Sequence, residues 1–415
     1  MLTNYIKIAL KVLGRRKFFT FISLFGISLT LVVLMVVTAV LDNAFTPRAP
    51  ESRLDRALVI YTIGIYGNEG GFTGNPGYGF LDKYARGLAA AERTTFFSDS
   101  DRVVLYHRGK KIETRMRWTD GAYWNVLDFK FLEGGPYTQA DDDNANHVAV
   151  ISRDMRRQLF DKDPAIGQLF EVDGQRYRVI GVVEDVPVLR SAGFSDIWVP
   201  NMTQKTAGWK TQNMGQYNAI VLAHSKADFP KLRREFNERI THFVFDDPKT
   251  QNRLVVSLNT LFEAFAVTFH FNDRMSAAEH ARLVRLIMLI LTLLFISLPT
   301  MNLVSINLSR IMERSSEIGV RKAFGASSRA LIGQFVLENV VLTIIGGAIG
   351  FVLSVIALSA ITRADLLPNA VFDVNLRIFA YGMLLAALFG VFSGVYPAWR
   401  MARMQPVNAL RGGAQ

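Results

Sequence analysis

Long uninterrupted runs of hydrophobic residues divide this chain into segments that mix polar and apolar positions. Four runs of at least 21 residues contain no charged side chain: 18–41, 286–306, 339–362 and 378–399. A helix needs about 20 apolar residues to cross the hydrocarbon core of a bilayer. The pattern therefore predicts four transmembrane helices, at 18–41, 286–306, 336–362 and 378–399.

The first run follows a short basic segment, as the apolar part of a cleaved signal peptide also does. Its 24 uncharged residues exceed the roughly 7–15 apolar residues of such a peptide. We therefore expect a retained membrane helix rather than a cleaved leader.

The segment 42–280 between the first two runs is long enough for a domain of its own. Residues 168–183 have the pattern of two strands joined by an Asp-Gly pair, a strong hairpin signal. Residues 147–152 have the pattern of a strand, and residues 153–160 that of a helix capped by Ser152. The predicted fold class is a membrane α-helical protein with four transmembrane helices and an α/β extracytoplasmic domain.

Three further segments of this domain carry weaker or different signals. Residues 228–244 predict an amphipathic helix with four apolar side chains on one side: Leu232, Phe236, Ile240 and Phe243. The glycine-rich residues 64–80 predict a loop or a mobile segment. Residues 272–285 are polar and helix-prone, so we expect a stalk that continues the second span outward.

The net charge of +11 is concentrated next to the apolar runs. Residues 1–17 carry five basic and no acidic side chains, residues 307–335 carry five basic and two acidic, and residues 397–415 carry three basic and no acidic. Elsewhere the two signs balance. This distribution follows the positive-inside rule of membrane proteins and argues against a nucleic-acid partner.

Placing the basic segments on the cytoplasmic side gives one orientation, with both termini inside and the large domain outside. The predicted organisation is, in order, a cytoplasmic amphipathic helix at 1–17, the first span at 18–41, the extracytoplasmic domain with its stalk at 42–280, the second span at 286–306, a cytoplasmic segment at 307–335, the third span at 336–362, a short outer loop at 363–377, the fourth span at 378–399 and a cytoplasmic tail at 400–415.

The composition excludes several kinds of active site. The chain has no cysteine, which rules out disulfides and thiolate chemistry. Residues 208–211 resemble part of a P-loop but lack its first glycine. The six histidines show no metal-binding spacing, and residues 141–143 lack the ligand spacing of a calcium loop, which favours a solvated turn. We therefore predict no catalytic residue, no metal site and no cofactor bound by this chain.

Small residues on the third and fourth runs are spaced for close helix packing. Gly346 and Gly350 form one GxxxG pair, and Gly390 and Gly394 form another. Such a spacing lets two helices approach closely. It fits packing within one chain and contact with a second copy equally well.

Polar residues on the second run and directly after it leave two interpretations open. Asn302, Ser305 and Asn307 could line a polar path, although such side chains more often bond to neighbouring helices. No charged residue lies in the middle of any run. This argues against an ion-coupled transporter, which usually needs an ionisable group within the membrane.

The cytoplasmic segment 307–335 has the pattern of two helices joined by a tight turn. Glu317 and Arg321 have the favoured i,i+4 order on the first helix. Gly325 can end that helix, and Ser327 or Ser328 can cap a second short helix that lies on the cytoplasmic face. A simple amphipathic connector at the membrane surface would show the same pattern.

Several stretches resemble the MacB/FtsX/LolC-type ABC transporter permeases. Residues 301–354, with the specific motif at 317–327, are similar to the C-terminal permease region, and residues 396–411 are similar to its closing pattern. Residues 9–30 resemble the helix that leads into the first span, and residues 123–186 resemble the MacB-type periplasmic core domain.

The resemblance implies a permease of the bacterial inner membrane whose large domain is periplasmic. It implies that the permease works as a dimer, with a second copy or a paralogue, and with two ABC ATPase subunits. The ATPases would bind ATP and Mg²⁺, and ATP hydrolysis would move the periplasmic domain by mechanotransmission. The residues that the resemblance assigns to ATPase coupling are Glu317, Ile318, Gly319, Arg321, Lys322, Gly325, Ala326, Ser327, Ser328 and Arg329.

Further partners and the biological role follow from the same resemblance. In the MacB branch of the family the ATPase precedes the first span, whereas here the chain starts 17 residues before it, so a separate ATPase subunit is expected. A periplasmic adaptor and an outer-membrane channel are left open. The large outer domain favours efflux from the periplasm or outer leaflet over the alternative, an FtsX-like signal transducer that regulates a cell-wall hydrolase.

Overall fold

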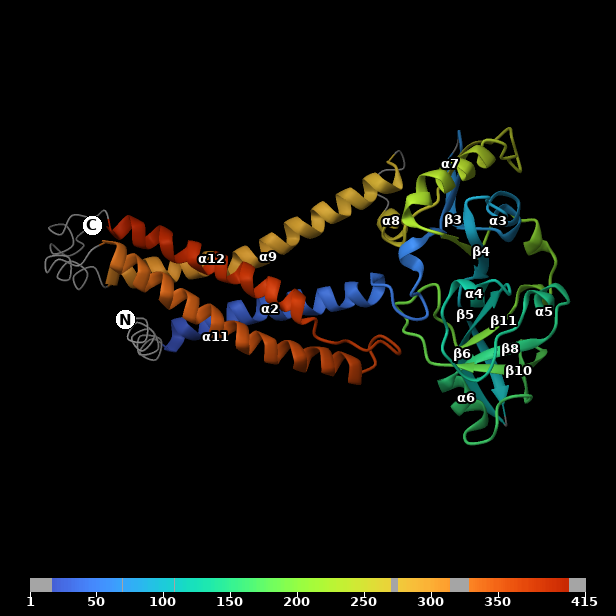
Figure 1. Cartoon of the computed structure of the whole chain (residues 1–415), viewed down its shortest axis with the longest axis horizontal. Coiled ribbons are helices and arrows are strands. Elements are labelled where there is room, and N and C mark those ends of the chain that lie inside the picture. The colour runs from blue at the N-terminus through green and yellow to red at the C-terminus, as the bar shows by residue number, and fades with distance from the viewer. Residues whose placement is uncertain (1–16, 69, 108, 270–274, 314–327, 403–415) are drawn as a thin grey trace. The chain divides into compact units, whose positions relative to one another are not determined.

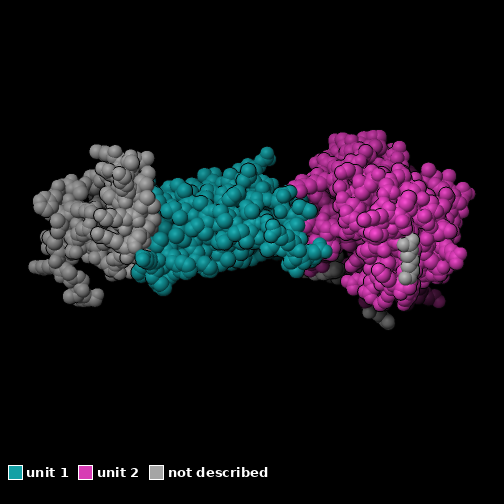
Figure 2. Space-filling view, turned by 90° about the horizontal axis from the view of Figure 1, so that it is seen from below, with its two compact units in different colours: residues 1–42, 285–366, 371–415 teal, residues 43–284, 367–370 magenta. Residues whose placement is uncertain are grey.

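The computed structural model describes residues 17–68, 70–107, 109–269, 275–313 and 328–402. The chain divides into two compact units, which Figure 2 colours separately. Unit 1 comprises residues 1–42, 285–366 and 371–415, and unit 2 comprises residues 43–284 and 367–370.

Unit 1 is built from long helices that contain the four predicted apolar runs (Figure 1). Their bounds are α2 (Lys17–Phe45), α9 (Ala277–Glu313, which starts in unit 2), α11 (Ser328–Arg363) and α12 (Leu376–Ala402). Among the described residues, α2 and residues 336–363 of α11 are long and apolar enough to cross a membrane, and α12 has a shorter apolar stretch, Leu376–Phe392. Membrane crossing by all four helices stays a prediction.

Unit 2 is an α/β unit whose main sheet has ten strands, in the order β1-β13-β4-β6-β11-β8-β10-β9-β5, with β7 beside β10. The strands are β1 (Ala57–Ile60), β4 (Ala91–Ser98), β5 (Asp101–His107), β6 (Lys110–Thr119), β7 (Phe131–Gly134), β8 (Val148–Ser152), β9 (Leu169–Val172), β10 (Gln175–Val183), β11 (Ile197–Pro200) and β13 (Tyr217–Ala223).

Part of this sheet closes on itself. Strand β5 pairs with β6 along its length and also meets β9 at Leu105 and Val172, so β6, β11, β8, β10, β9 and β5 form a closed ring. One buried hydrophobic cluster belongs to this ring and includes both of those residues together with Tyr177. Closure leaves no open edge between β5 and β6, which protects the pair from edge-to-edge association.

A second sheet of four strands runs in the order β12-β3-β2-β14. Its strands are β2 (Ile63–Gly67), β3 (Gly70–Pro76), β12 (Met214–Gly215) and β14 (Gln251–Val256). The loop predicted for residues 64–80 is therefore wrong. Strands β2 and β3 pair through their backbones, so glycine does not prevent the pairing. The Tyr66 ring also occupies the space that side chains at Gly64 and Gly71 would fill, which explains why glycine is found at these positions.

Short helices cover the sheets: α3 (Tyr78–Tyr84), α4 (Tyr123–Val126), α5 (Gln139–Asp143), α6 (Arg153–Phe160), α7 (Phe229–Ile240) and α8 (Leu261–Val267). Single 3₁₀ turns are η1 (Leu54–Arg56), η2 (Asn201–Thr203), η3 (Gly208–Lys210) and η4 (Lys226–Asp228).

Several local predictions are confirmed. Strand β8 leads into α6, and Ser152 Oγ accepts a hydrogen bond from Met155 N, 3.1 Å away, as an N-cap. Strands β9 and β10 form the predicted hairpin, in which Asp173 and Gly174 both have positive φ. Helix α7 lies within the predicted amphipathic segment and buries Leu232 and Phe236.

The acidic run 141–143 is not a fully solvated turn. It ends helix α5, and Asp142 is only 1% exposed. The Asp142 carboxylate accepts a hydrogen bond from Met202 N, 3.0 Å away, which explains why a charged residue is buried there.

Candidate functional site

Most of the predicted ATPase-coupling residues lie outside the described residues. Ser328 and Arg329 are described, and they are the first two residues of α11. This helix continues to Arg363, so the structure shows no break between residues 328–335 and the third apolar run. The sequence offers no proline there, and the single Gly333 costs a helix only about 1 kcal/mol.

The first GxxxG pair faces α2 of the same chain. A Cβ atom built on Gly346 would lie 3.0 Å from Ile27, and one on Gly350 would lie 3.2 Å from Leu31. The buried Ser28 hydroxyl donates a hydrogen bond to Gly346 O at 2.8 Å. Glycine thus lets the α2 and α11 backbones approach closely.

The second GxxxG pair lies on α12. A Cβ atom on Gly390 would lie 2.8 Å from Thr343 Oγ1 of α11. Asn339 Nδ2, also on α11, donates to Gly390 O at 3.4 Å. Gly394 lies one turn further along α12.

A buried cluster that sequence analysis missed lies just after α2, within unit 2. Glu51 is 1% exposed and accepts hydrogen bonds from Ala192 N at 2.9 Å and Gly193 N at 3.0 Å. Arg190 lies 3.9 Å from the Glu51 carboxylate and donates to Thr46 O at 2.7 Å. These contacts hold the chain that leaves α2 against the 190–193 turn.

A second buried cation stabilises the same turn from the sheet. Arg117 of β6 is 3% exposed and donates to Ser191 O at 2.9 Å and to Ala192 O. Burial raises the pKa of Glu51, and the smaller opposing effects of the Gly193 N–H and the Arg190 charge do not cancel this rise. The carboxyl group accepts hydrogen bonds from the turn and lies next to Arg190.

The loop between α11 and α12 reaches the same region of unit 2. Val188 N donates to Pro368 O at 2.9 Å, and Asn369 Nδ2 donates to Val186 O at 3.4 Å. We call residues 186–193 the junction segment. It is hydrogen-bonded both to the chain that follows α2 and to the loop that joins α11 to α12.

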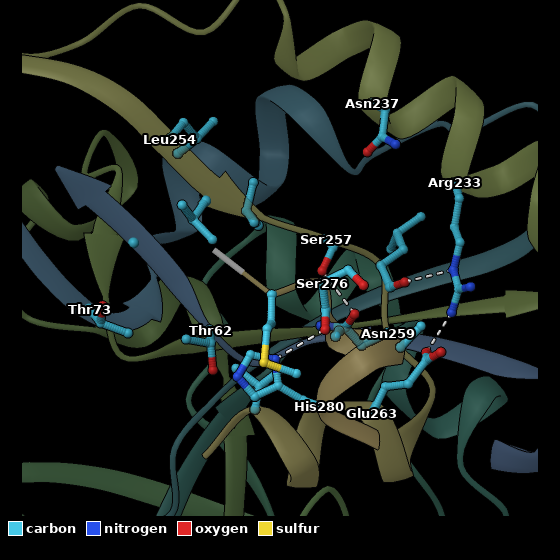
Figure 3. Close-up of a pocket in the computed structure, with 18 of the residues that line it drawn as sticks. Thr62, Thr73, Arg233, Asn237, Leu254, Ser257, Asn259, Glu263, Ser276 and His280 are labelled. Atoms are coloured by element: carbon cyan, nitrogen blue, oxygen red, sulfur yellow. Dashed lines mark hydrogen bonds and ion pairs between the residues drawn. The ribbon is translucent and has the colours of Figure 1, made fainter. Parts of the chain in front are cut away.

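A cavity of unit 2 has a volume of about 430 Å³. It lies between the four-stranded sheet, α7, α8 and the first turn of α9 (Figure 3). Arg233 and Glu263 form an ion pair at its wall with 2.5 Å between Nη2 and Oε2. His280 is 4% exposed, and its Nδ1 lies 3.0 Å from Ser276 O. The cavity could hold a small molecule next to the start of α9.

The described residues contain no group of three or more His, Cys, Asp or Glu side chains able to hold a metal ion. Burial raises the pKa of Asp120 and of Asp142 to about 6. Asp120 accepts hydrogen bonds from Thr95 Oγ1 at 2.6 Å and Phe96 N at 2.9 Å. These bonds give Asp120 a structural role.

Two protein-family models match the chain. The model of the MacB-like periplasmic core domain matches residues 20–239, and the model of the FtsX-like permease C-terminal region matches residues 287–406. The uncharacterized ABC transporter permease YknZ of Bacillus subtilis (strain 168) is 26% identical over 342 residues, which cover 80% of this chain and 79% of YknZ.

The macrolide export ATP-binding/permease protein MacB is also similar. MacB of Escherichia coli (strain K12) is 24% identical over 411 residues, which cover 97% of this chain and 59% of MacB. The chain thus spans only part of the length of that relative.

Solved structures of extracytoplasmic regions match about half of the chain. The extracellular domain of the transporter YknZ from Gram-positive bacteria aligns with 19% identity and a TM-score of 0.34, covering 47% of this chain and 98% of that domain. The periplasmic region of MacB from Actinobacillus actinomycetemcomitans aligns with 15% identity and a TM-score of 0.35, covering 52% and 94%. These scores are low, so the family assignment rests on the sequence matches.

Proposed function

Because this chain belongs to the ABC transporter permeases that combine a MacB-like periplasmic core domain with an FtsX-like permease domain, we propose that it couples ATP hydrolysis in the cytoplasm to movement of its extracytoplasmic domain. The substrate would be collected from the periplasm or the outer leaflet and exported. ATP and Mg²⁺ would be bound by two copies of a separate ABC ATPase subunit, and a second copy of this chain or a paralogue would complete the dimer.

The junction segment is the observation that carries this proposal. Residues 186–193 hold both the chain after α2 and the loop between α11 and α12 by hydrogen bonds within unit 2. Two separate connections to the apolar helices therefore end at one short segment of the extracytoplasmic domain. A rigid segment with two such attachments suits the transmission of helix movement.

Arg190 and Glu51 supply the rigidity that transmission requires. The side chains of both residues are at most 3% exposed, and together they bond three backbone groups of the 46–51 and 190–193 segments. Breaking such a buried pair costs about 3–5 kcal/mol, because the remaining charge is left without its partner. Small helix displacements would thus move the junction segment as a unit.

The proposal is tested by ATP hydrolysis in a reconstituted complex. The chain is co-expressed with a candidate ABC ATPase subunit, purified and inserted into nanodiscs. We expect ATPase activity that depends on the permease and is lost in Glu317→Lys, since this change reverses a charge in the predicted coupling motif. Glu238→Lys makes the same charge change on an exposed position of α7 and should retain full activity. A wild-type complex without hydrolysis would refute the transporter proposal.

A further inference from the structure

The cavity beside the start of α9 has the walls of a small-molecule site. Its volume of about 430 Å³ falls in the range of roughly 300–1,000 Å³ common for ligand pockets. Apolar side chains come from three elements and from the segment before α9: Leu254 and Val256 of β14, Val267 of α8, Met275, and Ala278 of α9. A ligand could therefore bury apolar surface on several sides.

Asn259 provides a fixed polar group in this wall. It is 7% exposed, and its Oδ1 accepts a hydrogen bond from Ser257 Oγ at 2.8 Å. In the part of the chain that the structure describes, no hydrogen bond from Asn259 Nδ2 is formed. A ligand that accepts a hydrogen bond from this nitrogen would gain about 1 kcal/mol of affinity, the net value of one neutral hydrogen bond.

The charges in the wall are paired with each other. Arg233 Nε donates to Leu258 O at 3.0 Å, and Arg233 Nη2 donates to Glu263 at 2.5 Å. The same Glu263 carboxylate accepts from Thr260 N at 2.7 Å and so caps α8. A charged ligand would have to compete with this pair and disturb the cap, whereas an uncharged ligand would leave both intact.

We propose that this cavity binds an uncharged amphipathic molecule that presents a hydrogen-bond acceptor to Asn259 Nδ2 and apolar groups to β14 and α8. The bound molecule would touch β14 and the first turn of α9 at the same time, since Ser276, Ala277 and Ala278 line the cavity. Binding would thus stabilise the position of α9 relative to the four-stranded sheet within unit 2. Binding to this cavity within unit 2 does not require the ATPase.

The absence of cysteine from the chain allows a clean labelling test. A single cysteine is introduced in the cavity with Ala278→Cys, or at an exposed control position with Ala227→Cys in η4. Both full-length proteins in nanodiscs are labelled with N-phenylmaleimide, which is uncharged and carries two carbonyl acceptors. We expect the labelling rate of Ala278→Cys to saturate with reagent concentration, as binding precedes reaction, and that of Ala227→Cys to rise linearly.

Two further comparisons test the chemistry of the site. A sulfonated phenylmaleimide, which is anionic, should show no saturation at Ala278→Cys. Adding Asn259→Leu should raise the half-saturating concentration of N-phenylmaleimide roughly fivefold, the effect of one neutral hydrogen bond. Adding Val267→Phe, which narrows the cavity without touching Asn259, should abolish saturation. Linear labelling of Ala278→Cys, or saturation that neither variant changes, would overturn the proposal.

Discussion

The buried carboxylate of Glu51 offers a quantitative test of the junction segment. Replacing it with leucine keeps an approximately similar size but removes the acceptor for Ala192 N and Gly193 N and the partner of Arg190. Loss of one member of a buried ion pair costs about 3–5 kcal/mol. Glu51→Gln also removes the charge opposite Arg190, but it keeps one oxygen for the two N–H groups, so it should be less destabilised than the leucine variant.

Tryptophan fluorescence during thermal unfolding measures this effect in the full chain. Four of the five tryptophans lie in unit 2, so the signal reports mainly on that unit: Trp118, Trp124, Trp198 and Trp209. In thermal scans, Glu51→Leu should lower the midpoint by about 10 °C for a unit of this size.

A surface control separates this effect from the loss of any glutamate. Glu113 is exposed and pairs with the exposed Lys111, so Glu113→Leu should leave the midpoint unchanged. The reasoning fails if Glu51→Leu also leaves it unchanged, or if the leucine and glutamine variants at Glu51 are equally destabilised.

Two other substitutions test the packing of unit 1 and the titration of unit 2. Gly350→Leu should destabilise the α2–α11 contact by about 1–3 kcal/mol. Gly333→Leu should not, because a Cβ atom at Gly333 would lie in open space. Equal shifts of the unfolding midpoint in the two variants would contradict the contact. The pKa of Asp142 is raised to about 6, so the folded state binds more protons than the unfolded state between pH 4 and 6. The contribution of this group to the free energy of unfolding therefore falls as pH rises. Asp142→Asn should therefore gain stability relative to wild type, by roughly 2–3 kcal/mol from pH 4 to pH 7; a pH-independent difference would refute this.

Local signals account for the parts of unit 2 that sequence analysis predicted correctly. Asp173-Gly174 marked the β9–β10 hairpin because positive φ is needed at both positions, and Ser152 marked the start of α6 because its hydroxyl caps the helix. Both signals depend on residues within a few positions of each other. The wrong loop at 64–80 arose because glycines within paired strands, such as Gly64 and Gly71 beside Tyr66, allow close approach of other groups and do not mark a loop.

The junction segment could not be predicted in the same way. Glu51, Arg117 and Arg190 lie far apart in the sequence. Each belongs to a charged residue type that is mostly found at the protein surface, although all three are buried here. Only the fold brings them to one buried turn. The partner of the Gly346/Gly350 pair was also undetermined, because GxxxG spacing specifies close approach without naming the helix that approaches.

Movement of the extracytoplasmic domain driven by ATP is the central claim, and a distance measurement tests it directly. Spin labels at Ala227→Cys in two copies of the chain, assembled with the ATPase in nanodiscs, report the separation of the two unit 2 domains by pulsed electron paramagnetic resonance. We predict that trapping ATP shifts the distance distribution in the wild-type background and leaves it unchanged in Glu317→Lys. A complex that hydrolyses ATP while the distribution stays the same would contradict mechanical coupling.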